Sequence, residues 1–109
     1  MRLPDDVVIP DGKITRYLLL PKPRSDKSKF LAKAGFTLNN PDELKLALQK
    51  QAISNDAIEE RSDQYGTFYQ VQGELVGVNG VWLSIISIWL HRRIDRKFQF
   101  VTLVPYKES

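Results

Sequence analysis

The sequence lacks cysteine and contains a single histidine among its 109 residues. The absence of cysteine excludes a disulfide framework, a thiolate nucleophile and a zinc–thiolate site. The acidic residues form no ligand spacing such as His-Glu-x-x-His, so we expect neither a metal site nor a cofactor. The sequence also contains no glycine-rich phosphate loop and no nucleophile elbow.

Long apolar runs are missing as well. The most apolar run, residues 81–90, has 10 residues and includes two serines, whereas a membrane helix needs about 20. Residues 1–12 lack the apolar region of a secretory signal. We therefore expect no membrane association, and the lack of cysteine fits a reducing cytoplasm.

The length suits one domain over residues 1–109. Hydrophobic residues make up 42% of the chain, which is enough to fill a core. Residues 1–12 contain Pro4 and Pro10 and are interpreted as an extended lead-in, followed by an α+β core over residues 13–109.

The first half of this core predicts one strand and two helices. Residues 14–20 favour a short strand, because two prolines follow closely. The first helix is expected to begin at Ser25 or Asp26 and to end at Gly35. The second is expected after Asn40 as N-cap, with Pro41 in its first position.

The second half predicts an antiparallel meander of three strands packed on the helices. Residues 67–75 alternate as a strand with one wet face, and Asn79-Gly80 marks a tight hairpin. Residues 81–90 are apolar on both faces and predict a central strand, and residues 98–106 predict the last one. The polar residues 55–66 are interpreted as a helix tail and a loop.

Basic residues are concentrated in two segments, while the net charge of the chain is only +3. Residues 22–33 contain five cations and one acid, and residues 91–97 contain four cations and one acid. Residues 39–63 between them have a net charge of −3. If the fold brings the basic segments together, they form a patch that attracts phosphate.

The segment from Trp89 to Phe100 holds the second basic cluster in a predicted hairpin between two strands. Such a hairpin is more often a solvated turn than a site. In the functional interpretation, Arg92, Arg93 and Arg96 clamp phosphates, and His91 acts as a general acid or base.

The start of the first predicted helix carries Arg24, Lys27 and Lys29. Lysines at a helix N-terminus oppose the helix dipole unless they serve an anionic ligand. A solvated basic turn is the alternative.

Aromatic side chains on a sheet face can stack bases, although they more often fill the core. Trp82 and Trp89 are seven residues apart in one predicted strand, so at most one of them is exposed. Thr102 near the end of the last strand can orient a phosphate, but threonine is also an ordinary strand residue.

Several blocks together resemble a known family: KITRYLLL, DKSKFLAKAGFTLNNPDEL, YGTFYQVQGELVGVNG, the apolar strand ending in Trp89, and FVTLVPY. This sequence is similar to an uncharacterised bacterial domain family. The family occurs as small stand-alone proteins and as C-terminal modules of some secreted polymorphic toxins. The resemblance spans about residues 9–106. It implies an α+β domain and, through the toxin contexts, a nuclease activity.

The order of the elements is also similar to barnase-like and ribosome-dependent toxin nucleases, which cleave RNA without metal. The matching positions at the helix start are Asp26 and Lys27. The others are Asn79, Gly80, Trp89 and Thr102.

Two departures from the family pattern matter. A histidine often precedes the Asp-Lys pair in the family, where this sequence has PKPRS. The turn commonly reads Gly-Pro-Asn-Gly, where this sequence has Gly77-Val78-Asn79-Gly80. Three alternatives stay open: an inactive copy, a site that uses Lys27 instead, or a domain that was never a nuclease.

Two hypotheses of function follow. The first is a metal-independent ribonuclease with Lys27, His91 and Thr102 as catalytic residues. Its phosphate-binding residues are Arg24, Lys29, Arg92, Arg93 and Arg96. The second is a non-catalytic module that binds nucleic acid or a small partner protein encoded by an adjacent gene. Homo-oligomers can form through a strand edge, for which residues 67–75 or 98–106 are the candidates.

Overall fold

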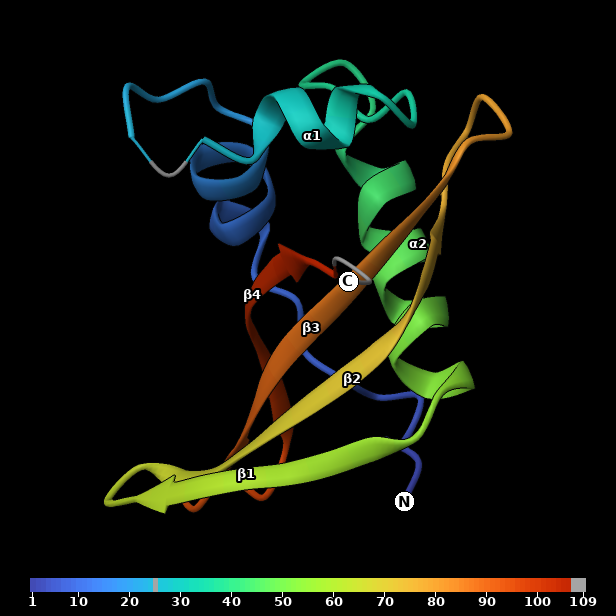
Figure 1. Ribbon diagram of the computed structural model, residues 1–109. Helices are drawn as coiled ribbons and strands as arrows, with labels where there is room; N and C mark the ends of the chain where they lie inside the picture. The colour runs from blue at the N-terminus through green and yellow to red at the C-terminus, as the bar shows by residue number, and fades with distance from the viewer. Residues whose placement is uncertain (25, 107–109) are drawn as a thin grey trace.

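The computed structural model of the protein describes residues 1–24 and 26–106. It shows a mixed α+β fold in which helices pack on one face of an antiparallel sheet of four strands (Figure 1). The sheet order follows the sequence, β1-β2-β3-β4. No helix in the described part of the chain is long and apolar enough to cross a membrane. The elements are η1 (Lys13–Leu18), α1 (Ser28–Ala32), α2 (Pro41–Ser54), β1 (Ala57–Asp63), β2 (Gly66–Val76), β3 (Trp82–Arg92) and β4 (Phe98–Pro105).

The predicted three-strand meander is present as β2, β3 and β4, and β3 is an internal strand as predicted. The prediction for residues 55–66 was wrong, because most of them form β1 and its turn. Only Ala57 of β1 is buried, so this edge strand has two wet faces and no alternation of apolar residues. β1 also covers β2, so residues 67–75 are not an edge, whereas β4 is one.

The predicted strand over residues 14–20 was also wrong, because Lys13–Leu18 form the π-helix η1. The N–H of Leu19 donates to the carbonyl of Ile14 at 3.0 Å, the i to i+5 bond of a π-helix. Ile14 and Leu18 are both buried, which places them on one helical face. These apolar residues therefore line one side of a wide helical turn and do not alternate between the two faces of a strand.

The lead-in is extended as predicted, but it belongs to the core. Its Leu3 and Ile9 side chains are buried. The backbone of Val8 exchanges hydrogen bonds with Phe98 and Phe100 of β4, both at 2.8 Å. At its other end, the carbonyl of Met1 accepts from the N–H of Ala57 in β1. The segment thus links the two edge strands.

The two predicted helices exist, and the first is shorter than expected. The Asp26 carboxylate accepts a bond of 2.8 Å from the N–H of Ser28, the first residue of α1. Ser25, the other predicted cap, lies outside the described residues. Asn40 is the N-cap residue of α2, and its side chain bonds the N–H of Thr37 and the carbonyl of Gly35.

The β2–β3 hairpin holds the C-terminal end of α1. The amide of Asn79 donates to the carbonyl of Lys33 at 3.0 Å. The N–H of Val78 donates to the carbonyl of Ala34, also at 3.0 Å. These bonds satisfy carbonyls that a helix end leaves free. The predicted tight turn at Asn79-Gly80 is therefore also a docking point for α1.

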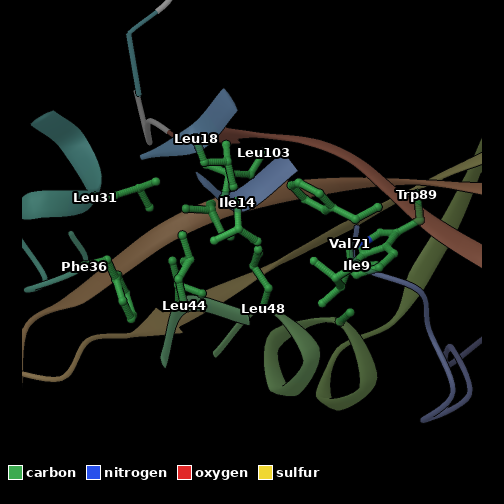
Figure 2. Close-up of a cluster of buried hydrophobic side chains, with 14 of the residues drawn as sticks. Ile9, Ile14, Leu18, Leu31, Phe36, Leu44, Leu48, Val71, Trp89 and Leu103 are labelled. Carbon is green, nitrogen blue, oxygen red and sulfur yellow. The ribbon is translucent and has the colours of Figure 1, made fainter. Parts of the chain in front are cut away.

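The core fills the space between the helices and the sheet (Figure 2). A chain of buried hydrogen bonds crosses it. The hydroxyl of Ser87 on β3 accepts from Trp89 Nε1 at 2.8 Å and donates to Gln51 Oε1 at 2.6 Å. Gln51 on α2 in turn donates through Nε2 to the carbonyl of Val71 on β2 at 2.9 Å. Helix and sheet are thus fixed in one register.

We predict that Ser87→Ala lowers the free energy of unfolding by about 2–4 kcal/mol, because it leaves buried groups of Gln51 and Trp89 without partners. Urea denaturation measures the change. The matched control is Ser84→Ala on the same strand, whose hydroxyl bonds Glu74 at the exposed face and whose loss is expected to cost less than about 0.5 kcal/mol. Equal losses for the two variants contradict the role given to Ser87.

Candidate active site

The candidate site is centred on Tyr17, a residue of η1 whose side chain reaches β4. Its hydroxyl is 2.7 Å from Oγ1 of Thr102, a residue 85 positions away in the sequence. Ile14 and Leu18 on the same π-helix anchor η1 in the core, so the tyrosine is held from both sides. Thr102, a predicted catalytic residue, therefore contacts a phenol that the sequence analysis did not select.

Three lysines surround the Tyr17 ring. The Nζ atoms of Lys13, Lys22 and Lys27 lie 5.1, 4.4 and 5.6 Å from the ring centroid, within the range of cation–π contacts. They come from η1, from the loop that follows it and from the N-cap of α1. We call Tyr17, Thr102 and these three lysines the tyrosine cluster.

The lysines of the tyrosine cluster form none of the four salt bridges found among the described residues. Three ammonium groups around one ring repel one another, and their contacts with Tyr17 offset part of that repulsion. An anion placed among them would relieve it. The tyrosine cluster therefore favours a phosphate-sized anionic ligand.

The same surroundings shift the acidity of Tyr17. Partial burial alone would raise its pKa, but the hydrogen bond from Thr102 and the positive charges of Lys27 and Lys13 outweigh that effect. The pKa of Tyr17 therefore lies below its ordinary value. A phenol of lowered pKa exchanges its proton more readily near neutral pH, as an acid–base catalyst requires.

The loop before α1 positions Lys27. Asp26 binds both the N–H and the hydroxyl of Ser28, and these bonds hold the pKa of the Asp26 carboxyl below its ordinary value. Arg24 in this loop has an exposed side chain. Lys29 is exposed and lines a separate pocket beside Leu19 and Phe36. Of the three cations predicted at the helix start, only Lys27 belongs to the tyrosine cluster.

The second basic segment lies at the other end of the sheet. The β3–β4 turn, with Arg93 and Arg96, is far from η1 and α1 (Figure 1). The two basic segments therefore do not merge into one patch. His91 does not lie beside the basic residues at the start of α1. The reason is the strand direction: β4 runs from this turn towards η1, so Thr102 pairs with Ile88, three residues before His91.

The His91 ring has structural contacts of its own. Nε2 lies 3.0 Å from the carbonyl of Arg96, so this nitrogen donates a hydrogen bond. The ring stacks on Phe98 with a centroid distance of 4.2 Å. Arg92 is paired with Asp95 and donates to Gln99 Oε1 at 2.7 Å.

Sequence reasoning missed Tyr17, the centre of the cluster, because a strand was assigned to its segment. One signal could have found it. Lys13 and Tyr17 are four residues apart, a spacing that brings side chains together in a helix but not in a strand. Within residues 1–24 and 26–106, no three His, Asp or Glu side chains converge as a metal site would require.

Comparison with known proteins places the chain in a family. It belongs to the family described as domain of unknown function DUF6883, which matches residues 2–107. No curated protein matches the sequence. Among solved structures, the fold is similar to a chain of a contact-dependent growth inhibition toxin–immunity protein complex from Klebsiella pneumoniae 342. The TM-score is 0.59 at 17% identity, over 94% of this chain and 96% of that one, which shows a shared fold.

We predict that Thr102→Val and Lys27→Met each raise the pKa of Tyr17, because each removes a group that stabilises the ionised phenol. Ultraviolet titration of tyrosine ionisation measures it, with the Tyr17→Phe protein subtracted to isolate this residue among the four tyrosines. Lys50→Met on α2 removes a positive charge away from η1 and is the control. An unchanged titration in both cluster variants would refute the account of this pKa.

Proposed function

We propose that this chain is a metal-independent ribonuclease of toxin type and that the tyrosine cluster is its active site. The observation that carries the proposal is a phenol of lowered pKa among three lysines that form no salt bridge with the described carboxylates. Metal-free RNA cleavage needs a base, an acid and cations for the charge that develops on the phosphate. The cluster supplies all three.

In the proposed reaction, the ionised Tyr17 oxygen takes the proton of a ribose 2′-hydroxyl. The 2′-oxygen then attacks the adjacent phosphorus, and the bond from phosphorus to the 5′-oxygen breaks. The Lys27 ammonium gives a proton to that leaving oxygen. The products are a 2′,3′-cyclic phosphate and a 5′-hydroxyl end.

The other members of the cluster have supporting roles. Lys13 and Lys22 stabilise the extra negative charge on the phosphate oxygens in the transition state. Thr102 is a positioning residue, because its hydroxyl holds the Tyr17 oxygen and favours its ionised form. Arg24 and Lys29, which flank Lys27, are assigned to phosphates next to the cleaved one. RNA as the substrate places the activity in the cytoplasm.

A second candidate function is a non-catalytic half of a two-protein pair. The similar fold in a toxin–immunity complex supports a small partner protein. So does the sheet face opposite the helices, which exposes Ile58, Trp82 and Val104. Trp82 is exposed and Trp89 is buried in the core, which agrees with the prediction that at most one of the two is exposed. A small partner protein is also compatible with a ribonuclease that the partner keeps inactive until release.

We predict that the purified wild-type protein cleaves single-stranded RNA in the presence of EDTA and leaves 5′-hydroxyl ends. Tyr17→Phe and Lys27→Met are each expected to slow cleavage about 100-fold or more, because each removes a proton-transfer group. The rate should rise with pH as Tyr17 ionises, and Thr102→Val should move that rise to higher pH. Gel analysis of end-labelled RNA measures all three effects.

The matched controls are Tyr69→Phe and Lys50→Met, which remove a hydroxyl and a cation outside the cluster and should leave cleavage unchanged. Induction in a bacterial host complements the assay, with growth arrest expected for wild type and the controls only. Folded wild-type protein that leaves RNA intact and does not arrest growth would favour the binding half of a pair.

A further inference from the structure

A second group of cations lies at the end of the sheet where β3 enters its turn to β4. Two adjoining pockets meet there and share the side chains of Arg92 and Arg93. The first, which we call the apolar pocket, has a volume of about 470 Å³. Its lining consists of Gln64, Tyr65, Leu90, Arg92, Arg93 and Ile94.

The second, which we call the cationic pocket, has a volume of about 380 Å³. Both volumes fall in the range of small-ligand sites. Three arginines and the chain's histidine are among the residues at the cationic pocket. Its lining consists of Gly66, Thr67, His91, Arg92, Arg93 and Arg96.

The apolar pocket exposes large side chains on a fixed backbone. Tyr65 is 66% and Ile94 is 88% exposed, although both carry large apolar groups. The N–H of Tyr65 donates to Asp63 Oδ1 at 2.8 Å, and its carbonyl accepts from the N–H of Arg93 at 3.1 Å. The two turns at this end are therefore tied together, and Tyr65 is an exposed ring on a supported backbone.

The arginines of the cationic pocket differ in their contacts. Arg92 is already engaged by Asp95 and Gln99. Arg93 and Arg96 form no salt bridge with the carboxylates that the structure describes. The backbone of Arg96 is fixed, since its N–H donates to the carbonyl of Arg92 at 2.8 Å and its carbonyl accepts from His91. Two guanidinium groups are thus available to a planar or tetrahedral anion.

We infer that this end of the sheet binds one nucleotide of a single-stranded RNA. The base stacks on Tyr65 against Leu90, and Arg93 and Arg96 hold the phosphodiester that follows. An exposed aromatic ring next to uncommitted arginines is the combination that single-stranded RNA requires, because an unstacked base offers a flat face beside its charged backbone. The inference rests on the proposed use of RNA as substrate and adds a recognition site to it.

The position of this site allows one strand to reach both places. Ile88 pairs with Thr102 of the tyrosine cluster, and Leu90 and Arg92 follow on the same face of β3. At about 3.3 Å per residue, Arg92 lies about 13 Å along the strand from Ile88. The nucleotide bound here is therefore not the one that is cut. We expect a preference for RNA longer than a dinucleotide.

Binding is tested in the Tyr17→Phe background, so that the RNA stays intact, by fluorescence anisotropy with a 12-nucleotide single-stranded RNA of mixed sequence. Tyr65→Ala is expected to weaken binding about tenfold. Arg93→Gln combined with Arg96→Gln should make the plot of log affinity against log salt shallower by about 1.4, from two lost phosphate contacts at about 0.7 each. Trp82→Ala, an exposed aromatic at the far end of β3, and Lys45→Gln with Lys50→Gln on α2 are the controls.

The outcomes separate this inference from the proposed cleavage. If RNA binding weakens in the Tyr65 and Arg93/Arg96 variants and not in the controls, the result supports the site, even if the wild-type protein cuts no RNA. Unchanged affinity and salt slope in those variants overturn the site, while cleavage by the wild type leaves the proposed activity standing. Failure of the Tyr17→Phe protein to bind RNA also overturns the site. So does a result in which a protein partner, and not RNA, shields Tyr65 and Arg93.

Discussion

The buried hydrogen bonds from Gln51 through Ser87 to Trp89 fix how the helices lie on the sheet, and the site depends on that placement. Each polar group in this series of hydrogen bonds has a partner. Among the described residues, no buried side-chain nitrogen or oxygen lacks one. Hydrophobic burial is non-directional and therefore specifies the register of α2 on β2 and β3 less strictly than directional hydrogen bonds do. The hydrogen bonds permit one register only. Once α2 is fixed, its buried leucines set the position of η1.

The tyrosine cluster follows from that placement. η1 is anchored by apolar residues on one side, so Tyr17 projects towards β4, where Thr102 meets it. α1 is held separately, through the β2–β3 hairpin, and brings Lys27 to the same ring. The N-terminal segment from Lys13 to Lys27 therefore meets Thr102 of β4, and η1 and α1 are each fixed by core or backbone contacts outside the cluster. Cations that repel one another are kept together because the scaffold, not their mutual contacts, determines where they lie.

Local patterns predicted the elements that have local causes. The alternation of β2, the apolar run of β3, the Asn79-Gly80 turn and the Asn40-Pro41 helix start all depend on near neighbours. β1 and η1 were missed because partners decide their structure. β1 is polar on both faces and is a strand through its pairing with β2. In the site, Thr102 was selected through the family resemblance, and Lys27 through both the resemblance and the basic charge at the predicted helix start. The separation of the two basic segments depends on strand direction, which the distribution of charge along the sequence does not reveal.

The contact between Tyr17 and Thr102 has a consequence for synthesis. The hydroxyls that meet at the centre of the site come from opposite ends of the chain, and the pairing of Val8 with β4 closes a loop of similar length. Such long closures make folding slow compared with that of helical bundles. A nascent chain on the ribosome would have no assembled site until β4 had emerged. The ribonuclease activity proposed for this chain would therefore not arise until nearly all of the residues that build the site had been made.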